Sequence, residues 1–85
     1  MDNRVAIISL VVQDREAAQR VNQLLHEYAG HVIGRMGVPY PKRDISLISI
    51  FLDAPGDQIS ALSGKLGMIR GVAAKTVYAK VEDNP

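Results

Sequence analysis

The 85-residue sequence contains no cysteine, and this absence excludes several kinds of chemistry. Without a thiol the chain can form no disulfide, and it offers neither a cysteine nucleophile nor a thiolate ligand for a metal. It also lacks any apolar run near the roughly 20 residues that a membrane-spanning helix requires. Because a cysteine-free chain is compatible with a reducing compartment, we expect a cytoplasmic protein with no secretory signal and no membrane association.

Aromatic residues and net charge are also scarce. Phe, Trp and Tyr make up only 5% of the residues although 47% are hydrophobic, so the core must consist mainly of Val, Ile, Leu and Ala. The formal net charge is +1, which gives no broad positive field for nucleic acid, and we expect no direct DNA binding. A chain this short is expected to form a single domain over residues 1–85.

Four segments have the composition of β-strands. Residues 4–12 (RVAIISLVV) and 45–52 (ISLISIFL) are apolar on both alternate faces, which is typical of strands covered on both sides. Residues 31–37 resemble a short strand weakened by an internal glycine, as at an edge or a bulge. Residues 72–81 alternate apolar and polar side chains, which favours an edge strand, and residues 82–85 are predicted to be a frayed tail.

Two helices are predicted between these strands. Asp14 can cap the first helix, whose apolar stripe runs to Tyr28 and stops before Gly30. The second helix is predicted to start at residues 53–54, because Pro55 suits the first helical position, where its missing N–H costs nothing. The strand–helix–strand–strand–helix–strand order predicts an α+β, ferredoxin-like fold. Its four-stranded antiparallel sheet has the order 4-1-3-2, with both helices on one face.

The glycine-containing segment 61–77 (ALSGKLGMIRGVAAKTV) does not fit a phosphate-binding loop. Such a loop runs from a strand into a helix, whereas Leu62 and Leu66 place a helix before Gly67. Gly67 is therefore predicted to end the helix in a left-handed conformation. Gly64, inside the helix, is predicted to allow close packing against the first helix.

One face of the predicted sheet has nothing to cover it. If Ile8, Leu10, Ile48, Ile50 and Leu52 face the helices, the other side carries Val5, Ile7, Ser9, Val11, Ile45, Leu47, Ser49 and Phe51. A contiguous apolar patch of this kind usually marks a partner surface. We therefore expect self-association into a dimer or tetramer, either through this sheet face or by edge-to-edge strand pairing. The two serines either meet each other or a symmetry mate, or simply let two sheets approach.

Other candidate sites have weaker patterns. Tyr40 lies between two prolines and before Lys42 and Arg43, which would suit a contact with a ligand or a protein partner. The alternative is a surface hairpin whose tyrosine covers the sheet edge. His26 and His31 are the only histidines and are not an i, i+4 pair. They could contribute to a metal site only across an oligomer interface, and they are otherwise exposed or capping.

Catalytic patterns are missing as well. The sequence has no Ser/His/Asp grouping, no HExxH motif and no close carboxylate pair in a predicted loop. We expect no enzyme activity, and the sequence implies no particular cofactor.

Three segments carry a resemblance to a known family: VVQDREAAQRVNQLLHEYA, RMGVPY and the segment ALSGKLGMIRGVAAKTV. From about residue 4 to residue 77 the chain resembles the family of iron-only hydrogenase system regulators, which are short ferredoxin-like proteins. That family is similar in fold to ACT domains and to the metal-sensing C-terminal domain of nickel-responsive regulators. The resemblance implies a cytoplasmic regulatory or sensing role and a ferredoxin-like oligomer.

The ligand-binding residues of these relatives do not carry over. Amino-acid-binding ACT domains commonly have a glycine after the first strand, where this chain has VQDRE. Nickel regulators use several histidines and a cysteine, and they read DNA with a ribbon-helix-helix segment that this sequence lacks. Two hypotheses remain. The chain is either a regulatory domain that senses a small ligand at a subunit interface, or an interaction module that docks on a regulatory protein through the turn of residues 38–43 (VPYPKR).

Overall fold

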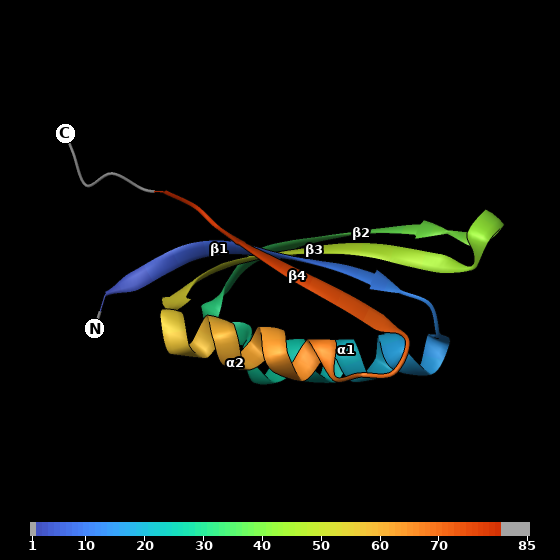
Figure 1. Ribbon diagram of the computed structural model, residues 1–85, viewed down its shortest axis with the longest axis horizontal. Helices are drawn as coiled ribbons and strands as arrows, with labels where there is room; N and C mark the ends of the chain where they lie inside the picture. The colour runs from blue at the N-terminus through green and yellow to red at the C-terminus, as the bar shows by residue number, and fades with distance from the viewer. Residues whose placement is uncertain (1, 81–85) are drawn as a thin grey trace.

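The computed structural model describes residues 2–80 and shows a four-stranded antiparallel sheet with two helices on one of its faces (Figure 1). The elements are β1 (Asn3–Val12), α1 (Arg15–Glu27), β2 (Val32–Tyr40), β3 (Ile45–Pro55), α2 (Gly56–Gly67) and β4 (Val72–Tyr78). The strand order β2-β3-β1-β4 confirms the predicted ferredoxin-like fold. The predicted tail at residues 82–85 lies outside the described residues.

The hydrophobic core lies between the sheet and the two helices, and the described buried side chains are all apolar. In β1 the buried residues alternate with more exposed ones, so that Ile8 and Leu10 point toward the helices. Ile50 and Leu52 of β3 do the same, as the sequence pattern predicts, and Ile48 packs at the margin of the core. Burying each such side chain contributes about 1.5–3 kcal/mol, so this single layer supplies most of the stability of a small domain.

Helix α1 begins as predicted. The Asp14 side chain accepts a hydrogen bond from the backbone N–H of Glu16 at 3.0 Å, which satisfies one of the free donors at the helix start. The helix then buries Ala17, Val21, Leu24 and Leu25 against the sheet. Their three- and four-residue spacing produces one apolar stripe and leaves the opposite side polar.

Strand β2 is longer than predicted. It continues beyond residue 37 to Tyr40, because Val38 pairs with Leu47 and Tyr40 pairs with Ile45 of the neighbouring strand. The predicted irregularity is present, since the register shifts between Val32 and Gly34. Tertiary pairing therefore overrides the turn-like composition of residues 38–40 (VPY), which contain one proline and lie between Gly37 and Pro41.

Helix α2 starts later than predicted. Asp53 and Ala54 belong to β3, where they pair with Val5 and Arg4 of β1. Ala54 is 1% exposed, so the strand gains burial by continuing. Pro55 occupies the N-cap position without a side-chain capping hydrogen bond, and the first helical residue is Gly56.

The predictions for two glycines of the segment 61–77 were wrong. Gly67 lies within α2, and the left-handed glycine is Gly71, with φ of 85°. The chain reverses there into β4, and the Gly71 carbonyl accepts a hydrogen bond from the N–H of Gln13 at 2.8 Å. Gly64 is exposed, and a Cβ at that position would meet no atom within 4 Å apart from the nearby backbone of its own helix, so close helix packing does not explain it.

Candidate functional site

The candidate site is the side of the sheet that faces away from the helices, here called the outer face (Figure 1). The eight residues predicted for it alternate with the core residues of β1 and β3, and none of the eight is buried. The register of the edge strands adds seven more: Gly34, Met36, Val38, Tyr40, Ala73, Lys75 and Val77. Of these, the sequence analysis had selected only Tyr40, because it assigned outer-face residues on the two central strands alone.

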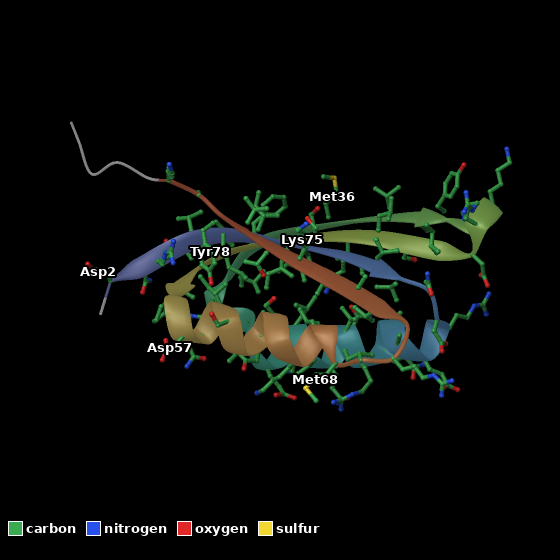
Figure 2. All side chains as sticks on the ribbon, in the orientation of Figure 1. Asp2, Met36, Asp57, Met68, Lys75 and Tyr78 are labelled. Carbon is green, nitrogen blue, oxygen red and sulfur yellow. The ribbon has the colours of Figure 1, made fainter. Side chains whose placement is uncertain are left out.

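Several apolar side chains of the outer face are highly exposed to solvent. Met36 is 59% exposed, Val38 50%, Leu47 42% and Val77 57%. Figure 2 shows Met36 directed away from the helices, whereas Met68 lies on the helix side of the molecule. Because Met36, Val38 and Leu47 are neighbours on adjoining strands, they form a continuous surface rather than isolated exposed residues.

Strand register arranges the outer face in three rows that cross the sheet. The middle row contains, in the order β2-β3-β1-β4, Met36, Ser49, Ser9 and Lys75. One flanking row contains Val38, Leu47, Val11 and Ala73, and the other contains Gly34, Phe51, Ile7 and Val77. A row with three polar members is therefore bordered on both sides by apolar rows.

A hollow of about 410 Å³ lies over the middle row and the row of Leu47 and Val11. The side chains of Ser9 and Ser49 are short, so the surface is lower there than at the larger residues beside them. Lys75 supplies the only charged side chain among the residues that line the hollow. This part of the outer face therefore combines a small polar floor with apolar walls.

The hairpin between β2 and β3 carries the other predicted contact residues. Tyr40 ends β2 and is 44% exposed, and Lys42 and Arg43 follow in the short helical turn Pro41–Arg43. The turn extends beyond the sheet and the helices at one end of the molecule (Figure 1). Tyr40 pairs with Ile45, so its ring belongs to the outer face while the two cations lie at the tip.

A second hollow, of about 510 Å³, lies between this hairpin and the start of α1. It is lined by Tyr40 together with Asp14, Arg15, Glu16 and Asp44. Three carboxylates and one guanidinium do not favour an anion, so the structure does not bring Lys42 and Arg43 into an anion-binding pocket with Tyr40.

The histidines lie near the end of α1. His26 is exposed on the helix, and His31 is half-buried in the turn Ala29–His31. His26 shares a small hollow with Asn22 and Arg35, and Arg35 donates a hydrogen bond to Asn22 at 2.8 Å. Within residues 2–80 no three His, Asp or Glu side chains gather as a metal site.

Lys65 connects the two helices on the opposite side of the molecule. Its ammonium lies 5.1 Å from the centroid of the Tyr28 ring. Hydrogen bonding to the Tyr28 side chain raises the pKa of Lys65 above its ordinary value. The contact joins the C-cap residue of α1 to the last turn of α2. Between residues 2 and 80, no helix has the length and apolarity to cross a membrane.

Comparison with known proteins gives one family and several similar structures. Residues 4–76 match the TM1266-like family, which is described as an iron-only hydrogenase system regulator. The structure of the uncharacterized protein TM1266 from Thermotoga maritima is similar with a TM-score of 0.90 and 42% sequence identity, over 93% of this chain and 100% of that chain. No curated protein matches the sequence.

Two more distant structures share the fold alone. The C-terminal domain of MgtC from Mycobacterium tuberculosis is similar with a TM-score of 0.68 and 14% identity, over 91% of this chain and 88% of that chain. The divalent ion tolerance protein CutA1 from Ehrlichia chaffeensis has a TM-score of 0.51 and 17% identity, over 95% and 87%. The family match over residues 4–76 and the 42% identity to TM1266 agree with the resemblance in the sequence, and the chain therefore belongs to the TM1266-like family of iron-only hydrogenase system regulators.

Proposed function

We propose that this chain is a small cytoplasmic regulatory domain that self-associates through its outer face and responds to a small ligand at the subunit interface. The observation that carries the proposal is the pair of apolar rows on the outer face, a face on which the apolar side chains of Met36, Val38 and Val77 are each at least half exposed. Apolar surface of this extent is more often covered by a partner than left in water. The description of the family as a regulator supports the same role.

The rows of the outer face are compatible with a second copy of the chain. A twofold axis parallel to the strands, between β1 and β3, would place each β2 over the β4 of the partner. Val38 would then face the partner's Ala73, and Gly34 would face the partner's Val77. At the edge strands a larger side chain would thus meet a small one across two sheets packed about 10 Å apart, while on the central strands Leu47 would face the partner's Val11.

Electrostatics favours this axis over the perpendicular one. An axis across the strands would place Lys75 against the partner's Lys75, and two like charges would be buried together. With the axis along the strands, each Lys75 lies over the partner's Met36, so its stem can cover an apolar side chain while its charge reaches the open edge. The two ammonium groups then lie at opposite edges, about 14 Å apart by three strand spacings.

The proposal is tested in two steps with the purified chain. Sedimentation equilibrium at micromolar concentration should give two or four times the 9.3 kDa chain mass. A thermal-shift screen against amino acids, nucleotides, organic acids and divalent metals should then identify one ligand class. A ligand at 100 times its Kd adds about 2.7 kcal/mol, which moves the melting temperature by roughly 10–20 °C in a domain of this size. A monomer, or no shift with any compound, would contradict the proposal.

A second candidate function is an oligomeric interaction module that docks on a regulatory protein. It rests on the projecting hairpin, where the 44% exposed Tyr40 precedes the cations Lys42 and Arg43. Tyrosine and arginine are common in the residues that dominate binding energies, and the prolines stiffen the turn that presents them.

Replacing Tyr40 by alanine separates the two functions. If the hairpin is a docking element, Tyr40→Ala should weaken capture of the partner protein by about 30-fold or more, because a central aromatic anchor contributes about 2 kcal/mol. Tyr40→Phe keeps the ring and serves as the control. Because Tyr40 also belongs to the outer face, the mass of the oligomer is measured in parallel. Loss of the ligand-induced thermal shift in Tyr40→Ala, with the oligomer intact, would assign the ring to the ligand site instead.

A further inference from the structure

The middle row of the outer face brings three polar side chains together on neighbouring strands. Ser9 of β1 is the direct partner of Ser49 on β3 and of Lys75 on β4. Adjacent strands lie about 4.8 Å apart, so the backbone positions of the three residues span about 10 Å across the sheet. All three residues line the hollow of about 410 Å³.

These groups are suited to an anion. An ammonium offers three hydrogen-bond donors and no acceptor, and each serine hydroxyl can also donate. No aspartate or glutamate lines the hollow, so nothing at the site neutralises Lys75. None of the side-chain hydrogen bonds described among residues 2–80 uses Ser9, Ser49 or Lys75, which leaves their donors available.

The walls of the same hollow are apolar. They are formed by the side chains of Met36, Val38, Leu47 and Val11 with the small Ala73 at one edge. An inorganic anion would leave these walls in water, whereas an apolar group attached to the anion would cover them. Methionine also adapts its shape to irregular apolar ligands. The volume is at the small end of the range for ligand sites, which is roughly 300–1,000 Å³.

We propose that this hollow binds a small amphipathic carboxylate, with its single negative charge on Lys75 and the two serine hydroxyls and its apolar body over Met36, Val38 and Leu47. The single negative charge of a carboxylate balances the single positive charge of Lys75, whereas the two negative charges of a phosphate dianion would exceed it. The inference rests on the proposed function, since it names the class of ligand for the interface. With the ligand bound, the Lys75 ammonium would contact the carboxylate instead of reaching the open edge. The partner's side chains would then cover the apolar body of the ligand and exclude water from the lysine–carboxylate contact.

The test uses octanoate as the probe, in a thermal-shift assay and in isothermal titration calorimetry of the full chain. Octanol, octylamine and inorganic phosphate are the matched compounds. Octanoate should raise the melting temperature and bind stoichiometrically, and the other three should bind at least 10-fold more weakly. If octanol binds as tightly as octanoate, the hollow recognises only the apolar body and not the charge. If phosphate binds as tightly as octanoate, the apolar walls do not contribute to binding. Either result overturns the inference.

Substitutions locate the binding. Lys75→Met should weaken the binding of octanoate by about 10-fold or more. Lys75→Arg should retain most of the wild-type affinity, because it keeps the positive charge. The Ser9→Ala/Ser49→Ala double variant should weaken binding less, while Lys80→Met, which removes an exposed charge beyond β4, should leave it unchanged. Circular dichroism verifies that each variant is folded. Wild-type affinity in Lys75→Met would overturn the assignment.

The two proposals can fail separately. If octanoate does not bind but another compound class shifts the melting temperature of an oligomer, the inference fails and the proposed function stands. If octanoate binds at Lys75 in a chain that sediments as a monomer, the ligand site is supported and the proposed self-association through the outer face is contradicted. Nuclear magnetic resonance shift changes confined to residues around Ser9, Ser49 and Lys75 would support the site independently.

Discussion

Replacing Leu47 by glutamate is expected to convert the oligomer into a folded monomer. Leu47 lies in a flanking row of the outer face and is 42% exposed in the single chain, so a carboxylate there costs little in the monomer. In the proposed dimer it would face the partner's Val11, and an unpaired charge buried in such a place costs several kcal/mol. Self-association should weaken by about 1,000-fold or more, which sedimentation velocity over a concentration series would measure.

A matched control is available on the other side of the molecule. Met68 follows α2 and is 87% exposed, and Figure 2 places it on the side opposite Met36. Met68→Glu introduces the same charge without touching the outer face, so the oligomer should persist. If Leu47→Glu also sediments as an oligomer, the outer face is not the interface. Edge-to-edge pairing through β2 or β4 would then become the arrangement to test.

Replacing Gly71 by alanine should produce the second large effect, a loss of about 1–3 kcal/mol of folding stability. Gly71 has φ of 85°, a conformation that side-chain-bearing residues rarely adopt, and an added Cβ would lie 3.2 Å from the Cβ of Asp14. Relief of this contact would disturb the helix cap at Asp14 and the hydrogen bond from Gln13 to the Gly71 carbonyl. The melting temperature should fall by about 10 °C.

Replacing Gly64 by alanine should instead increase the folding stability. Gly64 is an exposed interior residue of α2, and apart from the nearby backbone of its own helix a Cβ there would meet no atom within 4 Å. Alanine at this position should raise stability by about 0.5–1 kcal/mol through its better helix propensity. Urea denaturation of both variants measures the difference. Destabilisation by Gly64→Ala, or no effect of Gly71→Ala, would contradict the conformations described for these glycines.

Several features of the fold follow from local sequence patterns. The strands β1 and β3 could be predicted because their apolar residues occupy both alternate faces, and α1 could be predicted from its apolar stripe and the cap at Asp14. The element ends were harder to predict. The extension of β2 to Tyr40 and of β3 to Pro55 depends on pairing with a neighbouring strand, which local composition does not encode.

The conformations of the glycines were also not predictable from local sequence. Gly67 follows the apolar helical residue Leu66, and Gly71 follows Arg70 just before the next strand, so local spacing alone could not decide which of them turns left-handed. In the structure the choice follows from where the chain must enter β4 beside Gln13, a residue 58 positions away from Gly71. Contacts this distant in sequence are fixed by the packing of the whole domain.

By itself, the amino-acid sequence determined the ferredoxin-like order of elements, the buried face of the central strands and an apolar opposite face, because the period of the apolar residues is a local property. Only the tertiary structure placed Met36, Ser49, Ser9 and Lys75 in one row and gave that row a hollow. These residues come from four strands, and their alignment depends on strand register. Register is a collective result of core packing, since a slip of one residue would turn every side chain of a strand to the wrong face.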